Sequence, residues 1–91
     1  MNTAIVFINT QVDQVAEVAE ALVSLSGVTE VYSVTGSLDL IAIVRTRTVD
    51  EIADVVTGQM NKVPGITSTQ THMAFRAYSS HDLEAAFSLG M

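Results

Sequence analysis

Cysteine is absent from this sequence, proline occurs once, and charged residues make up only 15% of the chain. Without thiols the chain can form neither disulfides nor the thiolate metal sites that stabilise many small domains. Hydrophobic residues make up 48%, which excludes a disordered chain because there is ample apolar surface to bury. At 91 residues the chain fits a single domain. A domain of this size buries only about 60–65% of its unfolded surface, so we expect self-association to supply the missing core.

Basic residues are few, since ten acidic residues oppose only Arg45, Arg47, Lys62 and Arg76, for a formal net charge of −6. Such a field repels phosphate backbones, so we expect no direct nucleic-acid binding. The chain shows no basic leader and no apolar run near the roughly 20 residues of a membrane span. We therefore expect a cytoplasmic protein with no membrane contact.

Motifs of catalysis are missing as well. The sequence has no phosphate-binding loop, no Gly-x-Ser-x-Gly elbow and no zinc-binding His-x-x-x-His. Acid–base chemistry would depend on His72 or a carboxylate. His81 has only Asp82 and Glu84 at metal-ligand spacing, so we expect no metal site. The sequence thus predicts a protein that is not an enzyme and has no cofactor.

Two kinds of hydrophobic spacing alternate in the first half of the chain. Residues 4–8 are apolar and β-branched, which predicts a strand. Helical spacing from Val12 onward predicts a helix capped by Thr10 and ended by Gly27. Residues 28–35 and 38–44 predict two further strands, joined by a tight hairpin at Gly36-Ser37.

The second half repeats this plan. Thr48 and Glu51 form a capping-box sequence before a helix in which Ile52, Val56 and Met60 recur. Pro64-Gly65 ends this helix, and residues 66–78 predict a fourth strand. Each helix-to-strand junction carries a similar segment, Ser26-Gly27-Val28-Thr29 and Pro64-Gly65-Ile66-Thr67. The order βαββαβ predicts an α+β, ferredoxin-like domain over residues 1–78, with four antiparallel strands and two helices on one face.

The predicted third strand is apolar on both sides. One side carries Leu38, Leu40, Ala42 and Val44, and the other carries Ile41 and Ile43, interrupted only by Asp39. Helices can cover only one face, and a large exposed apolar patch is rare on a monomer. We therefore expect a homodimer packed sheet to sheet, burying roughly 800 Å² per partner.

Residues 79–91 form a separate tail. Leu83, Ala86 and Phe87 share one side of a predicted short helix that ends at Gly90. This tail is either a frayed or docked terminus or a helix that reaches over a neighbouring subunit.

Two segments resemble one family. Val31-Tyr32-Ser33-Val34-Thr35-Gly36-Ser37-Leu38-Asp39-Leu40-Ile41 resembles the Val-x-Gly-Asp-Tyr-Asp hairpin of the Lrp/AsnC effector domain. Pro64-Gly65-Ile66-Thr67-Ser68-Thr69-Gln70-Thr71 is similar to that domain's Pro-Gly-Val-x-x-Thr-x-Thr strand. The resemblance covers residues 3–78 and implies a stand-alone effector domain without the family's helix-turn-helix. It also implies a small-molecule ligand, an amino acid, bound where dimers meet in a ring such as an octamer.

The resemblance places Gly36, Ser37, Leu38 and Asp39 on one wall of the ligand site and Thr69 and Thr71 on another. An amino-acid zwitterion needs an acceptor for its ammonium, which Asp39 offers. The threonines and loop amides offer donors for its carboxylate. Ser37 occupies the position of the family's first aspartate after the glycine. Because a carboxylate is lost there, we expect weaker binding of an ammonium group.

Other interpretations of these residues and of the fold remain open. Asp39 could instead accept hairpin amides, the threonines could reflect ordinary strand propensity, and His72 could be a solvated edge residue. The same fold also serves cofactor-free α+β-barrel enzymes of monooxygenase or isomerase type, with His72 or Tyr32 in an internal pocket. A third alternative is a structural module that forms hetero-oligomers with full-length Lrp/AsnC-type regulators.

Overall fold

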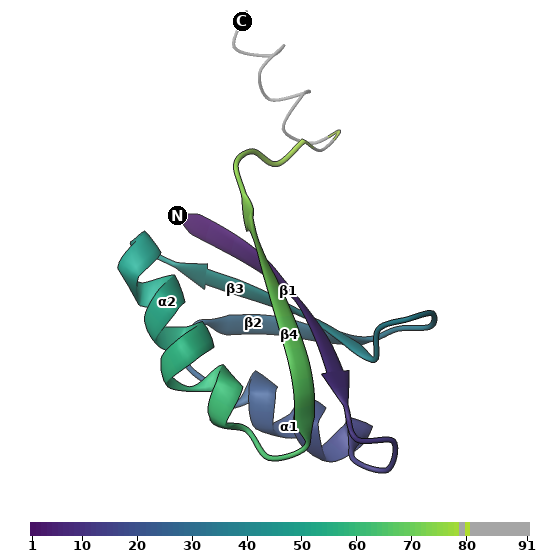
Figure 1. Cartoon of the computed structure of the whole chain (residues 1–91). Helices are drawn as coiled ribbons and strands as arrows, with labels where there is room; N and C mark the ends of the chain where they lie inside the picture. The colour runs from purple at the N-terminus through teal and green to yellow at the C-terminus, as the bar shows by residue number, and fades with distance from the viewer. Residues whose placement is uncertain (79, 81–91) are drawn as a thin grey trace, which may run out of the picture.

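Strands and helices follow one another in the order that the hydrophobic pattern predicts. The computed structural model describes residues 1–78 and 80. Its elements are β1 (Asn2–Thr10), α1 (Val15–Val23), β2 (Val28–Ser33), β3 (Leu40–Thr46), α2 (Val49–Gly58), the 3-10 turn η1 (Met60–Lys62) and β4 (Ile66–Ala74). The strands form one antiparallel sheet in the order β2-β3-β1-β4, and both helices lie on one face of it (Figure 1). The predicted ferredoxin-like fold is therefore confirmed, and β1 and β3 are its two central strands.

The core lies between the sheet and the helices. Every second residue of the central strands points toward α1 and α2, and the register aligns Val6 with Ala42 and Ile8 with Leu40. The buried apolar residues of the core come from both layers: Ala4, Val6, Ile8, Val28, Leu40, Ala42 and Val44 from the sheet, and Val18, Leu22, Ile52, Val55, Val56 and Met60 from the helices and η1.

The opposite side of the sheet carries no helix. Its centre is formed by Ile5, Phe7, Ile41 and Ile43, which alternate with the core residues and are only partly buried. We call these four side chains and their surroundings the helix-free face. The prediction that β3 is apolar on both sides therefore holds for residues 40–44.

Several boundaries differ from the sequence-based expectation. Helix α1 begins at Val15 after Gln14, and not near Val12, because Thr10 is the last residue of β1 and cannot cap it. The tight hairpin at Gly36-Ser37 is in fact a six-residue loop, Val34–Asp39, because β2 ends at Ser33 and β3 begins at Leu40. Leu38 therefore does not share the strand face expected of it.

The second helix starts where the capping box predicts. The Thr48 side chain accepts a hydrogen bond from the Glu51 amide at 3.2 Å, and the Thr48 hydroxyl lies 3.2 Å from the Glu51 carboxylate. The helical pattern stops at Gly58, and Met60 is buried from η1 instead. Strand β4 ends at Ala74, so residues 75–78 lie beyond the sheet. The predicted tail helix with Leu83, Ala86, Phe87 and Gly90 lies outside the described residues.

Neither α1 nor α2, the helices of the described part, is both long and apolar enough to cross a bilayer.

Candidate functional site

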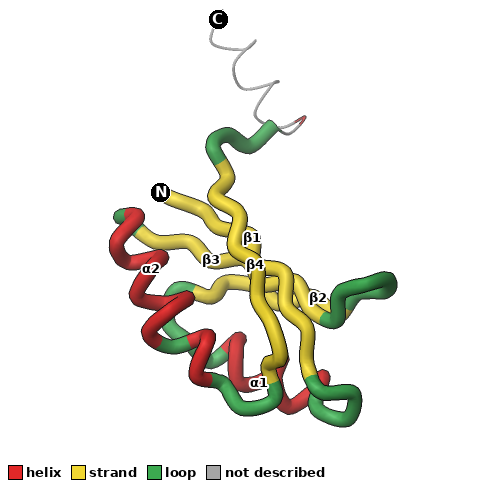
Figure 2. Tube along the Cα trace, viewed as in Figure 1, coloured by secondary structure: helices red, strands yellow, loops and turns green. Residues whose placement is uncertain are grey.

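The predicted site residues fall on two separate elements. Gly36, Ser37 and Leu38 lie in the loop Val34–Asp39, hereafter the hairpin loop, which projects away from the helices (Figure 2). Gly36 has φ +109°, a left-handed conformation that L side chains rarely adopt, and a Cβ added there would meet no atom within 4 Å. Glycine is thus required by the backbone of this turn and not by crowding.

Asp39 closes the hairpin loop through three hydrogen bonds. Its amide donates to the Ile8 carbonyl at 3.1 Å, and its carbonyl accepts from the Val34 amide at 3.1 Å. Its carboxylate Oδ2 accepts from the backbone amide of Thr10 at 2.9 Å. The carboxylate is therefore partly engaged inside the molecule, but its donor is an amide at the end of β1 and not one of the hairpin amides that the structural alternative named.

The Asn9 side chain makes a second connection between the hairpin loop and β1. With its side-chain nitrogen turned toward these groups, Asn9 donates to the Ser37 carbonyl at 3.2 Å and to the Ile8 carbonyl at 3.3 Å. Next to it, the Gln11 amide donates to the Gly65 carbonyl at 2.7 Å, just before β4 begins. The hairpin loop, the end of β1 and the start of β4 are thus joined by a continuous set of hydrogen bonds.

Thr69 and Thr71 lie on β4 opposite Ile8 and Val6, so they point to the helix side of the sheet. Thr69 is half-buried, and its hydroxyl lies 3.1 Å from the Asn61 side-chain oxygen. Thr71 is exposed. Thr71 therefore has the more accessible hydroxyl of the two.

The two predicted walls do not meet within one subunit. Leu40 and Thr69 both pair with Ile8, from opposite sides of β1. Two strand spacings, roughly 10 Å, therefore separate them. Two hollows among the described residues lie at the other end of the sheet and contain none of the six predicted residues. One, of about 360 Å³, lies between α2 and Arg45–Arg47, and one, of about 380 Å³, lies over Ile5, Ile43 and Ala74–Ala77.

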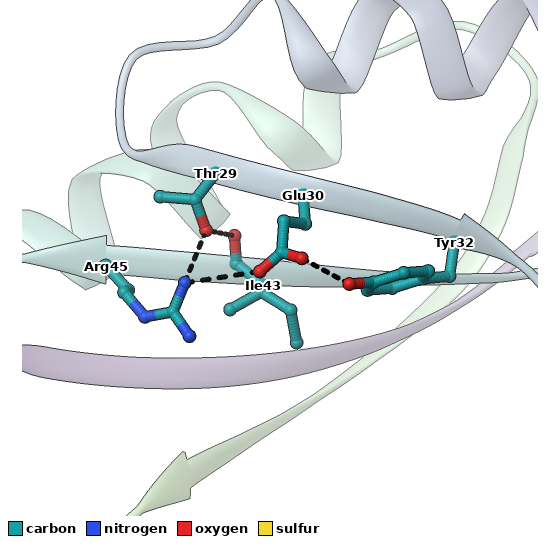
Figure 3. A network of polar contacts seen from close by, with 5 residues as sticks. All are labelled: Thr29, Glu30, Tyr32, Ile43 and Arg45. Atoms are coloured by element: carbon teal, nitrogen blue, oxygen red, sulfur yellow. Dashed lines mark hydrogen bonds and ion pairs between the residues drawn. The ribbon is translucent and has the colours of Figure 1, made fainter. Parts of the chain in front are cut away.

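A polar network joins β2 and β3 at the edge of the helix-free face (Figure 3). The Tyr32 hydroxyl donates to the Glu30 carboxylate, and Arg45 Nη1 lies 3.4 Å from Glu30 Oε1 and 3.0 Å from Thr29 Oγ1. The hydrogen bond from Tyr32 and the Arg45 charge lower the pKa of Glu30, and the same carboxylate raises the pKa of Tyr32. The network bridges the register irregularity between Val28 and Glu30.

Two residues that an enzyme of this fold could use are engaged elsewhere. The His72 ring lies against Phe7, with ring centroids 4.8 Å apart, and Tyr32 is held by Glu30. Neither lines either of the two hollows. Within residues 1–78 and 80, no three His, Asp or Glu side chains are grouped to hold a metal ion.

Sequence reasoning missed Asn9, Thr10 and Asn61 as neighbours of the site. Asn9 and Asn61 donate or accept through side chains that a single sequence gives no reason to single out. Thr10 participates through its backbone amide, so its identity carried no signal at all.

Comparisons with known proteins agree on one family. The model of the Lrp/AsnC ligand binding domain matches residues 3–83. The crystal structure of TTHA0845 from Thermus thermophilus is 46% identical, covers 87% of this chain and 99% of its own, and superposes with a TM-score of 0.81.

Two further structures have the same fold. Hypothetical protein PHS023 from Pyrococcus horikoshii is 33% identical, over 89% of this chain and 98% of its own, with a TM-score of 0.78. A transcriptional regulator from Neisseria meningitidis, solved as its L-Met complex, is 12% identical, over 86% of this chain and 52% of its own, with a TM-score of 0.76. No curated protein sequence matched.

Proposed function

Because this chain belongs to the Lrp/AsnC ligand-binding domain family, we propose that it binds an amino acid at a site formed where subunits meet. The family is one of regulators, and the proposed role is regulatory and not catalytic. Occupancy of a site shared between subunits favours the assembled form by mass action, which is how ligand concentration would be read out.

One observation carries this proposal, the separation of the two walls. The hairpin loop and Thr71 lie on opposite sides of β1, and neither lines either of the two hollows described above for residues 1–78 and 80. Each wall exposes its polar groups outward, so another subunit must supply the facing wall. A site of this kind exists only in the assembly.

The free groups of the two walls suit an α-amino acid. In the described part of the chain, the amides of Gly36, Ser37 and Leu38 donate no intramolecular hydrogen bond. Such amides, together with the Thr71 hydroxyl, are donors for a carboxylate. The loop carbonyls are acceptors for an ammonium group. The L-Met complex of the Neisseria regulator supports this ligand class, by fold alone.

The subunits that form such a site are proposed to be dimers joined through the helix-free face, which then associate into a ring. Ile5, Phe7, Ile41 and Ile43 supply an apolar centre without a charged side chain. A second copy is the partner that an isologous contact of this kind requires.

The test is a panel of L-amino acids in thermal-shift and calorimetric titrations, with the mass of the assembly followed by analytical ultracentrifugation. We expect at least one amino acid to raise Tm and to shift the mass distribution at millimolar concentration or below. Thr71→Val, which replaces the hydroxyl with a methyl group of similar size, should weaken that binding roughly tenfold. Thr57→Val on the outer side of α2 is the matched control. No response to any amino acid at millimolar concentration would contradict the proposal.

A further inference from the structure

We infer that Asp39 is a positioning residue of this site: its carboxylate fixes the hairpin loop to the end of β1 and, through Gln11, to the start of β4. The expected effect of Asp39 on ligand binding rests on the proposed function, whereas the positioning of the loop is a property of the unliganded protein. The inference assigns the Asp39 carboxylate a partner inside the chain, the Thr10 amide, in place of the ligand ammonium.

Three bonds at one residue carry this assignment. The Asp39 carbonyl accepts a hydrogen bond from the Val34 amide across the loop, and the Asp39 amide donates to the Ile8 carbonyl. The Asp39 carboxylate accepts from the Thr10 amide. Thr10 is 8% exposed and Asp39 is half-buried, so the carboxylate bond is partly shielded from water. A hydrogen bond to a charged acceptor is stronger than a neutral one, and shielding reduces competition from solvent.

Beyond Thr10 the connection reaches the second wall. Thr10 is followed by Gln11, whose amide donates to Gly65 at 2.7 Å, and the Thr10 hydroxyl donates to the Gln11 carbonyl at 3.0 Å. Gly65 directly precedes β4, which carries Thr71. Asp39 therefore sets the hairpin loop at a fixed place relative to β4 within each subunit.

Without this bond the loop would have one side-chain restraint fewer. Gly36 and Ser37 are exposed, and Leu38 is half-buried. Among the described residues of β1, the Asn9 side chain also bonds the loop, at the Ser37 carbonyl. Loss of the Asp39 carboxylate would leave the backbone bonds of Asp39 to Ile8 and Val34 as the restraints at the base of the loop, without the bond to Thr10.

Substitution can separate a positioning role from a charge role. Asp39→Asn removes the charge but keeps an oxygen that can accept from Thr10. Asp39→Ala removes both, and Asp39→Ser removes the charge and leaves only a hydroxyl oxygen one bond closer to the backbone, should the alanine variant fold poorly. Asp54→Asn and Asp54→Ala change net charge identically on the exposed surface of α2 and serve as controls.

Amide hydrogen exchange of the unliganded protein is the primary readout. We expect Asp39→Ala and Asp39→Ser to speed exchange at Thr10, Gln11 and the amides of residues 34 and 39 by roughly tenfold or more. Asp39→Asn should stay close to the parent protein. Unchanged exchange in Asp39→Ala and Asp39→Ser, or equally fast exchange in Asp39→Asn, would overturn the inference.

Binding of the panel amino acids gives the second readout. We expect Asp39→Asn to keep affinity within about threefold, while Asp39→Ala loses roughly tenfold or more. If Asp39→Asn loses as much affinity as Asp39→Ala while its Thr10 amide still exchanges slowly, Asp39 acts on the ligand by charge and the inference is wrong. If no amino acid binds the parent protein, the proposed function fails, and the exchange results alone decide the role of Asp39.

Discussion

Glu30 and Tyr32 share one side of β2, two residues apart, so their side chains meet without any long-range packing. The Tyr32 hydroxyl donates to the Glu30 carboxylate, and Arg45 from β3 approaches the same carboxylate. All three side chains are exposed, so solvent screens the ion pair and its contribution to stability is small. Titration is consequently the informative measurement for this network.

We expect the Glu30 pKa to lie below its usual 4.5 and to move upward toward it in Tyr32→Phe, which deletes the largest cause of the lowering. Any stabilisation from Glu30 is present above pH 4.5 and is lost as pH falls through the lowered pKa. For Tyr32 the sign is reversed: its pKa is raised above 10.0, so the stabilisation is lost as pH rises through that raised value. Carboxyl carbon NMR of both proteins measures the Glu30 shift.

Tyr78→Phe is the control for this titration, because Tyr78 is exposed beyond the end of β4. Identical Glu30 midpoints in the parent protein and in Tyr32→Phe would show that the hydroxyl does not bond the carboxylate in solution.

Single residues mark the limit of what the sequence can predict. Asp39 stood out because it interrupts an apolar run, yet its partner is a backbone amide supplied by the end of β1. Pattern reasoning assigned Thr10 to the helix cap, since threonine favours that position, whereas pairing with Ile66 extends β1 to include it. Tertiary pairing overrode local propensity there, and no local signal reports such pairing.

Helix α2 shows the opposite case, in which local chemistry decides the element. The Thr48 hydroxyl caps the helix by accepting a hydrogen bond from the Glu51 amide, as the capping-box spacing predicts. We expect Thr48→Ala to lower the free energy of unfolding by about 1 kcal/mol, because one amide of the first turn loses its acceptor. Urea denaturation of the parent protein and the variant, fitted with a common m-value, measures this loss.

Thr57→Ala is the matched control on the same helix. The Thr57 hydroxyl donates back to Ala53, four residues earlier, so it satisfies no free helix amide. Its replacement should change the free energy of unfolding by less than about 0.5 kcal/mol. Equal effects of the two substitutions would contradict the capping role of Thr48.

Two turn glycines differ in a way that the sequence does not show. Gly36 and Gly65 both have positive φ, +109° and +96°, but a Cβ at Gly65 would collide with the Gln14 side chain and lie 2.9 Å from Val18 Cγ2. Gly36→Ala should cost about 1–2 kcal/mol from the backbone alone. Gly65→Ala should cost about 1–3 kcal/mol beyond that, because α1 packs against the turn.

Chemical denaturation of both glycine variants, measured without ligand, separates these two costs. A Gly65→Ala protein that is no less stable than Gly36→Ala would mean that α1 does not press on this turn. The repeated junction with Pro64-Gly65 indicates a turn, but the crowding by α1 becomes visible only in the folded chain.

At the scale of the whole molecule, the distribution of charge favours one surface for self-association. Strands β1 and β4 carry no Asp, Glu, Lys or Arg, and the two charged residues at the edge of the helix-free face, Glu30 and Arg45, have opposite signs. Both helices, in contrast, carry acidic residues on their outer sides. Two copies that each carry a formal charge of −6 meet with the least repulsion through the helix-free face. Its apolar centre would gain stability from burial that the helices cannot provide.

We expect Ile43→Lys to convert the assembly into monomers, because pairing would bury an ammonium group without a partner. Ile43 is only partly buried in the single chain, so the variant should still fold. Val23→Lys is the matched control, since Val23 is 53% exposed on α1 and lies on the opposite side of the molecule. Light scattering at micromolar concentration, with circular dichroism to verify folding, distinguishes the two. If folded Ile43→Lys keeps the parent mass, the subunits associate through another surface, and the facing walls of the ligand site must be sought there.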